Sequence, residues 1–179
     1  MKELIIINGP MGIGKSTVSQ RLARLAAPAA YLDGDWCWQM HPFCPDAENR
    51  AMVIKNICFL LRSFLENSHW ERVLFCWVIP EEEIFSRILR PLDDLSFRLH
   101  KITLLATPET LEQRLRKDIA SGLRQADSLE RGLSYLQRYG EMDTIKLYTD
   151  DMSPDQAAAA VLRLVQEGGE AWENESSRP

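Results

Sequence analysis

The feature that most constrains this chain is a glycine-rich turn between an apolar run and a helical stretch near its start. Residues 4–7 are consecutive branched apolar residues, the pattern of a strand buried on both faces. Behind the turn at 9–16, the apolar residues at 18, 22 and 25 recur at helical spacing, so we expect a helix over 16–25. A buried strand that passes through a short turn into a helix predicts a parallel sheet covered by helices.

The same alternation of short apolar runs and helical stretches continues along the chain. We expect further strands at 31–32, 72–79, 99–106 and 145–149, and helices at 46–67, at 81–89, from 108 onward and at 154–166. Thr107 and Ser153 each precede a proline, which predicts two helix N-caps. The sequence therefore predicts one α/β domain over residues 1–167, with a five-stranded parallel sheet between two layers of helices, and a polar, disordered tail at 168–179.

The turn itself matches the spacing GxxxxGK[ST] at every fixed position from Gly9 to Ser16. Glycines let backbone N–H groups point at one centre, and the positive end of the following helix attracts phosphate oxygens. We predict that this turn binds a nucleoside triphosphate, with Lys15 on the β and γ phosphates and Ser16 on Mg²⁺. The alternative is a glycine-rich turn with a chance Lys-Ser pair. The predicted nucleotide contacts in the turn are Gly9, Met11, Gly12, Ile13, Gly14, Lys15, Ser16 and Thr17.

Charge and apolar patterning argue against several other classes of protein. The net charge of −5 would repel a nucleic-acid backbone, so we expect no nucleic-acid partner. No segment fits a secretory signal or a membrane span, so we expect a cytoplasmic protein. The four cysteines form no CxxC pair and are expected to be free thiols. Cys37, His41 and Cys44 invite a zinc interpretation, but a fourth ligand has no obvious source.

The carboxylates that would complete a magnesium site beside the glycine-rich turn follow the second expected strand. The third expected strand ends in Val78-Ile79 without an acid, so the magnesium shell must find its carboxylate elsewhere. Asp33 and Asp35 are the candidates, because ligands of open parallel sheets gather beyond the carboxyl ends of the strands. The alternative is that Asp33-Gly34-Asp35 forms only a turn and a helix cap.

The residues from Gly9 to Thr17, together with Leu32-Asp33-Gly34-Asp35, resemble the small P-loop kinases. These include gluconate, shikimate and adenylylsulfate kinases, chloramphenicol phosphotransferase and the nucleoside-monophosphate kinases. The resemblance spans roughly residues 3–166 and implies a sheet in the order 2-3-1-4-5, with Mg²⁺ and ATP as cofactors. It also implies that Asp35 orients or deprotonates the acceptor hydroxyl, and that Asp33 lies near the metal or shares that role.

The resemblance further implies an arginine-bearing lid at about 114–140. It assigns Arg114 to the adenine base, and Arg116, Lys117 and Arg124 to phosphate, with Arg124 as a catalytic group. Gly122 and Gly132 interrupt this stretch, which predicts a mobile segment. Residues 150–154 are expected along the adenine edge. The alternative for each arginine is a solvated helix face.

The acceptor is expected between the second and third strands. An aromatic and basic mixture there suits a ring or sugar that bears an anionic group, although such aromatics are more often part of the core. The residues are Trp36, Trp38, His41, Phe43, Arg50, Lys55, Asn56 and Arg62.

The leading hypothesis is an ATP-dependent phosphotransferase, monomeric or homodimeric, that acts on a small-molecule hydroxyl or phosphate. The alternatives are an ATP-binding or ATP-hydrolysing switch without an acceptor, and a toxin-like or antibiotic-modifying kinase.

Overall fold

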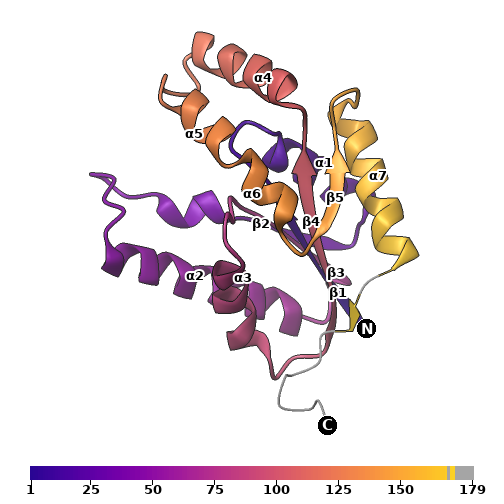
Figure 1. Cartoon of the computed structure of the whole chain (residues 1–179). Coiled ribbons are helices and arrows are strands. Elements are labelled where there is room, and N and C mark those ends of the chain that lie inside the picture. The colour runs from indigo at the N-terminus through magenta and orange to yellow at the C-terminus, as the bar shows by residue number, and fades with distance from the viewer. Residues whose placement is uncertain (169, 172–179) are drawn as a thin grey trace.

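The computed structural model describes residues 1–168 and 170–171, and its centre is a parallel sheet (Figure 1). The strands lie in the order β2-β3-β1-β4-β5, which confirms the predicted fold. Parallel pairing joins β1 to both β3 and β4, so β1 is the middle strand of the sheet. The strands are β1 (Lys2–Asn8), β2 (Ala29–Asp33), β3 (Arg72–Cys76), β4 (Phe97–Leu105) and β5 (Ile145–Tyr148).

A sixth, two-residue strand, β6 (Glu170–Ala171), pairs antiparallel with the start of β4. These two residues fall within the tail that was expected to be disordered, and backbone pairing with β4 is the reason that they do not follow that prediction. The rest of the expected tail, except Gly168, lies outside the described residues.

Helices cover both faces of the sheet, and further helices lie beyond the carboxyl ends of the strands (Figure 1). Alternate residues of β1 enter two different cores: Leu4 and Ile6 pack with α2 and α3, while Ile5 and Ile7 pack with α1 and α7. This explains the uninterrupted apolar run, because both faces of the strand are covered. The helices are α1 (Lys15–Leu25), α2 (Ala47–Glu66), α3 (Glu82–Leu89), α4 (Pro108–Ala120), α5 (Ser128–Ser134), α6 (Leu136–Glu141) and α7 (Pro154–Glu167). Two short 3₁₀ helices, η1 (Gly34–Trp38) and η2 (Arg90–Leu92), follow β2 and α3.

Both predicted helix caps are present. The Thr107 hydroxyl accepts a hydrogen bond from the backbone N–H of Thr110. Ser153 and Gln156 form a reciprocal capping box at the start of α7. These caps fix where α4 and α7 begin, next to the carboxyl ends of β4 and β5.

The third strand is shorter than predicted, because it ends at Cys76 and not at Ile79. The Asn8 side chain, at the end of β1, donates to the Ile79 carbonyl and accepts from the Ile79 N–H, both at 2.9 Å. A side-chain amide therefore satisfies backbone groups that a neighbouring strand would otherwise pair. Trp77 follows the end of β3 and still donates its backbone N–H to the Ile7 carbonyl of β1 at 3.2 Å, and the chain leaves the sheet after it.

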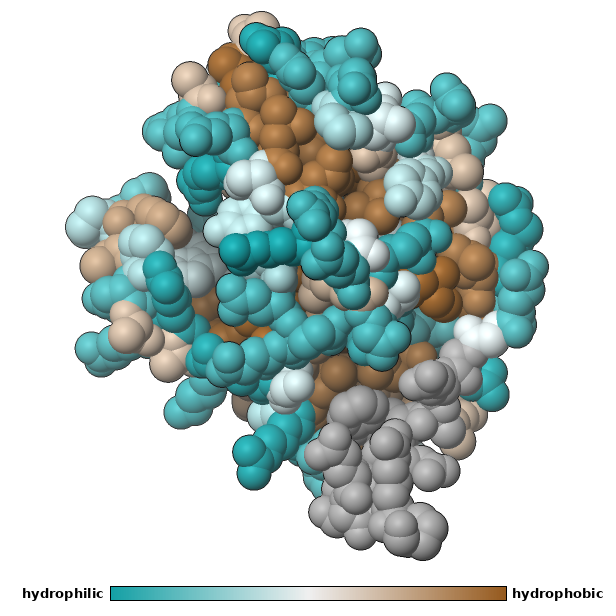
Figure 2. Space-filling view, in the orientation of Figure 1, coloured by the Kyte–Doolittle hydropathy of each residue, from teal (hydrophilic) through white to brown (hydrophobic). Residues whose placement is uncertain are grey.

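The segment around Gly122 and Gly132 is more regular than predicted, since Gly132 lies inside α5. A Cβ atom at Gly132 would lie 2.7 Å from Cδ1 of Leu115, a residue of α4. Gly12, in the glycine-rich turn, approaches the same leucine even more closely, at 2.4 Å from Cδ2. Leu115 is fully buried between these two glycines, and Figure 2 shows further apolar side chains gathered where α4 and α5 meet.

Among the described residues, no helix has both the length and the apolar character needed to cross a membrane.

Candidate nucleotide and acceptor site

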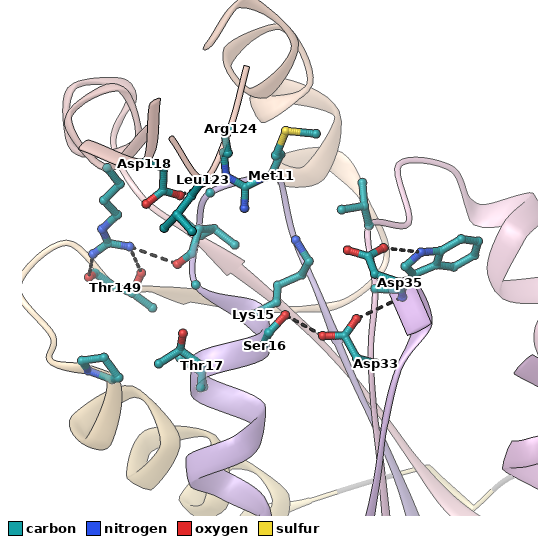
Figure 3. A pocket seen from close by; sticks show the side chains of 18 of the residues that line it. Met11, Lys15, Ser16, Thr17, Asp33, Asp35, Asp118, Leu123, Arg124 and Thr149 are labelled. Carbon is teal, nitrogen blue, oxygen red and sulfur yellow. Dashed lines mark hydrogen bonds and ion pairs between the residues drawn. The ribbon is translucent and has the colours of Figure 1, made fainter. Parts of the chain in front are cut away.

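One cavity of about 860 Å³ lies beyond the carboxyl ends of the strands, where the glycine-rich turn meets residues that follow β2 and β3. Figure 3 shows Lys15 in its middle, with Thr149 on one side and the carboxylates Asp33 and Asp35 on the other. The cavity therefore has two sides. We name them after the predicted ligands: the nucleotide side lies toward Thr149, and the acceptor side lies toward Asp33 and Asp35. Seven residues of the turn line it: Met11, Gly12, Ile13, Gly14, Lys15, Ser16 and Thr17.

The shape of the turn places backbone donors at the start of α1. Gly14 has a φ of 103°, in the left-handed region that only glycine adopts at low cost, and it directly precedes the helix. The first N–H groups of the helix have no partner within it, so they are free to meet phosphate oxygens. Gly9, also predicted as a nucleotide contact, does not line the cavity, because it lies against the backbone carbonyl of Leu104 in β4.

Lys15 is buried, and its ammonium group donates to the Pro10 carbonyl oxygen at 2.9 Å. Burial lowers the pKa of Lys15 to about 8, because the charged form loses its hydration. The carboxylates of Asp35 and Asp33 oppose this shift, while Arg124 adds to it. The lysine thus lies within electrostatic reach of both predicted carboxylates and of one predicted arginine.

Asp33 is held by three donors. The Ser16 hydroxyl donates to its Oδ2 atom at 2.7 Å, and the Tyr31 hydroxyl donates to the same oxygen at 3.1 Å. The backbone N–H of Asp35 donates to Oδ1 at 3.1 Å and makes Asp33 the N-cap of η1. Asp33 therefore caps a helix, as the alternative interpretation predicted, and its carboxylate also contacts the glycine-rich turn through Ser16. The functional role of the two aspartates stays a prediction.

The oxygens of Ser16 and Asp33 fit a magnesium ion bound together with phosphates. Mg²⁺ prefers hard oxygen ligands, usually one or two from the protein and the rest from phosphate and water. Within the part of the chain that the structure describes, no three His, Cys, Asp or Glu side chains gather into a metal cluster. Cys37, His41 and Cys44 do not gather into such a cluster in this part of the chain.

The second carboxylate, that of Asp35, is held in a different way. Its Oδ1 atom accepts a hydrogen bond of 3.2 Å from the indole N–H of Trp77. Burial raises the pKa of Asp35, and the nearby charge of Asp33 adds to this, while Lys15, the Trp77 hydrogen bond and Arg124 lower it. Asp35 is thus a more basic carboxylate than usual, with one donor on its Oδ1 atom and cations nearby.

Trp77 is a site residue that the sequence analysis missed. A Cβ atom at Gly34 would lie 2.5 Å from Cγ of Trp77, so the indole packs directly on the glycine between the two aspartates. The sequence carried one signal for this, namely an aromatic residue at the end of the third strand where an acid was sought. Its contact with Gly34 depends on the pairing of β2 with β3, which local pattern does not reveal.

Of the arginines predicted to contact the nucleotide, Arg114 and Arg124 line the cavity and Arg116 does not. Arg114 donates to the Ile13 carbonyl at 3.2 Å and to the Thr149 hydroxyl at 3.0 Å, so it joins the turn to the end of β5. Arg124 lines the cavity, and its Nε donates to Asp118 at 2.9 Å. Lys117 and Arg131 also line the cavity.

Arg116 does not reach the site. It pairs with Glu112 on the exposed face of α4 and does not line the cavity, so for this residue the solvated-face alternative holds. The helix itself carried the signal: Leu111 and Leu115 are buried, and position 116 points away from that stripe.

The remaining lining residues complete the two sides. Of residues 150–154, which were expected along the adenine edge, Met152 and Pro154 line the cavity, whereas the Asp150 carboxylate accepts hydrogen bonds from the backbone N–H and the hydroxyl of Thr107. Contact of this segment with adenine stays a prediction. Thr149, Ala157 and Leu123 line the cavity as well.

On the acceptor side, the lining includes Trp38, Phe43, Trp77 and Val78. The predicted acceptor residues Trp36, His41, Arg50, Lys55, Asn56 and Arg62 do not line the cavity.

Comparisons with solved structures identify the architecture. The tunicamycin resistance protein of Deinococcus radiodurans superposes with a TM-score of 0.65 at 18% identity, covering 94% of this chain and 98% of that one. Shikimate kinase of Acinetobacter baumannii in complex with shikimate gives 0.62 at 20% identity, covering 93% and 94%. APS kinase of Mycobacterium tuberculosis in complex with AMPPNP and APS gives 0.63 at 19% identity, covering 92% and 98%. The fold is thus that of the P-loop small-molecule kinases.

A search among curated proteins finds no match. The family model described as "AAA domain" (AAA_18) matches residues 5–131, more than half of the chain, and this span contains the turn, both aspartates and Arg124. The protein therefore belongs to this AAA domain family.

Proposed function

We propose that this protein is an ATP-dependent phosphotransferase that moves the γ-phosphoryl group of Mg·ATP to a hydroxyl group of a small molecule. The observation that carries the proposal is that Lys15, Asp35 and Arg124, from three separate parts of the chain, line one cavity and act on one another electrostatically. The volume of the cavity, about 860 Å³, lies within the range of ~300–1,000 Å³ typical of ligand sites.

The two substrates have separate places in this cavity. The triphosphate would lie along the turn and the start of α1, with the nucleoside toward Arg114, Thr149 and Met152. The acceptor would lie on the other side of Lys15, against Asp35 and the aromatic residues (Figure 3). Such an arrangement holds the acceptor hydroxyl in line with the γ-phosphorus, which is most of what phosphoryl transfer requires of a protein.

Asp35 is the better candidate for the base. Both Asp33 oxygens already accept hydrogen bonds, whereas Asp35 has a raised pKa and accepts one indole N–H on Oδ1. As the bond from the acceptor oxygen to phosphorus forms and the bond to the ADP oxygen breaks, the hydroxyl proton moves to the Asp35 carboxylate. Lys15 and Arg124 offset the negative charge on the transferring group.

Asp33 and Ser16 are the residues that would hold magnesium. When bound, the ion would neutralise phosphate charge. The three donors to Asp33 keep its carboxylate fixed beside the Ser16 hydroxyl.

Replacing Lys15 by Ala should lower phosphoryl transfer by more than about 10²-fold, because the γ-phosphate loses its buried cation. The measurement is acceptor-stimulated ADP release, compared with release in the absence of acceptor. Turnover at the wild-type rate would refute the assignment. Hydrolysis that no acceptor stimulates would favour the switch protein over the kinase.

Asp35→Asn should slow transfer by about 10²–10⁴-fold, because the amide cannot take the hydroxyl proton. Affinity for Mg·ATP, measured by calorimetry, should change little, since the nucleotide side is intact. A large loss of Mg·ATP affinity would instead make Asp35 a metal ligand. Asp33→Asn is the matched comparison, and it should weaken Mg·ATP binding in the presence of magnesium.

A further inference from the structure

The charges on the acceptor side are negative. Among the described lining residues at and after the ends of β2 and β3, the charged ones are Asp33, the last residue of β2, and Asp35, and the others are Trp38, Phe43, Trp77 and Val78. The basic residues expected to bind an anionic acceptor are elsewhere: Arg50 and Lys55 lie on exposed positions of α2, outside the cavity lining. Arg62 donates to the carboxylates of Glu66 and Asp94 at the surface.

Four lid cations line the cavity. Arg114 and Lys117 belong to α4, where Arg114 reaches Thr149 on the nucleotide side, and the other two are paired with carboxylates. Arg124 is paired with Asp118 at 2.9 Å and Arg131 with Asp127 at 3.3 Å, so each brings a carboxylate with it. Arg124 also acts electrostatically on both Lys15 and Asp35, and in the proposed function its charge offsets that of the transferring phosphoryl group. An anionic group on the acceptor would therefore face the Asp35 carboxylate without a cation of its own, because Lys15 and Arg124 serve the phosphates and Asp33 is proposed to hold magnesium.

Aromatic rings form the rest of this side. Phe43 is 64% exposed although it is a large apolar side chain, and it lines the cavity beside Trp38, with ring centroids 5.6 Å apart. Trp77 is fixed by its packing on Gly34 and its hydrogen bond to Asp35. Such rings attract apolar ring faces and cations, and their negative faces repel anions.

We propose that the acceptor is a hydroxylated compound without an anionic group, neutral or positively charged, whose flat apolar face packs on Phe43, Trp38 and Trp77. This inference rests on the proposed function and differs from the expectation of an anionic acceptor.

The test uses sets of probes that share a skeleton and differ in charge, with the wild-type protein and Mg·ATP. One set is glucose, glucosamine and gluconate, and a second is 4-hydroxybenzyl alcohol, tyramine and 4-hydroxybenzoate. Acceptor-stimulated ADP release reports transfer, and quenching of tryptophan fluorescence in the presence of AMPPNP reports binding without chemistry. We expect at least tenfold higher kcat/KM or affinity for the neutral or the cationic member of a set than for the anionic member.

Two variants separate a specific contact from a general effect. Phe43→Ala should weaken probe binding at least fivefold with the KM for ATP changed less than twofold, and Phe43→Tyr should restore binding. Phe59→Ala is the matched control, because Phe59 is 68% exposed but does not line the cavity. Preference for the anionic members, binding of none of the probes, or equal effects of the two alanine variants would overturn the inference. Binding with the expected charge preference but without ADP release above the no-acceptor level would support the charge preference of the site and count against phosphoryl transfer.

Discussion

The two sides of the cavity are built in different ways. The nucleotide side is dominated by consecutive residues, 11–17, whose geometry depends on glycine backbone angles and the start of one helix. The acceptor side brings together Asp35 and Trp77, which meet because β2 pairs with β3, and adds Phe43 from the segment before α2. The first side depends on local structure and the second on tertiary structure. It follows that the acceptor side can change in sequence while the phosphate turn stays intact.

Arg124 is expected to affect both sides, since its charge acts on Lys15 and on Asp35. Arg124→Ala should lower kcat by about 10²-fold, because a cation facing the transferring phosphoryl group is lost. The KM values for ATP and for the acceptor should change much less. Steady-state kinetics with each substrate varied in turn provides the measurement.

The matched control is Arg116→Ala, which removes an arginine from the exposed face of the neighbouring helix α4. Its kinetics should equal those of the wild type. Equal losses in the two variants would mean that the effect comes from the net charge of the lid and not from contact with the phosphoryl group.

A second prediction concerns the nucleotide side alone. Because the pKa of Lys15 is lowered to about 8, its ammonium group loses its proton as the pH rises through that value. Affinity for Mg·ATP should therefore be steady below pH 7 and fall about tenfold between pH 7 and pH 9. Calorimetry across this range is the measurement.

Lys15→Arg is the control for that titration, because a guanidinium group keeps its charge throughout the range. Its affinity, even if lower overall, should not vary with pH. The same tenfold fall in the arginine variant would assign the titration to another group.

The smallest effect is expected on the acceptor side. Trp77→Phe removes the N–H that donates to Asp35, and this hydrogen bond lowers the pKa of that carboxyl. Its loss should raise the pKa of Asp35 further, so that the acid limb of the kcat profile moves to higher pH by up to about one unit. At pH 7, kcat should fall by no more than a few-fold, and Mg·ATP affinity should not change.

Trp36→Phe serves for comparison, since that indole is 53% exposed, contacts Tyr31 and does not line the cavity. Its pH profile should match the wild type. If the acid limb of the Trp77→Phe profile is not shifted, then either Asp35 is not the base or Trp77 does not position it.

Much of the fold could be predicted from sequence, because its signals are local. The apolar stripe that predicted a helix at 46–67 corresponds to α2 at 47–66. Thr107 and Ser153, each followed by a proline, cap helices as expected. The glycine spacing likewise predicted the turn, because glycine adopts a φ angle such as the 103° of Gly14 at low cost and other residues do not.

The parts that could not be predicted depend on contacts between distant segments. The end of β3 at Cys76 depends on the Asn8 side chain, 68 positions earlier in the chain, and the pairing of β6 with β4 joins two distant segments. The acceptor side also required the structure, since composition alone placed Arg50 and Arg62 there, whereas Arg62 pairs with acids at the surface. Local pattern predicts elements, but it does not reveal which side chains two elements place face to face.

The position of Leu115 has a mechanical consequence. One methyl-bearing side chain fills the space left by two glycines, Gly12 in the turn and Gly132 in α5. Because close-packed groups cannot move independently, a displacement of the turn when phosphates arrive would push on Leu115 and through it on α5. The same contact works in the opposite direction, so we expect the glycine-rich turn and α5 to shift together and not independently.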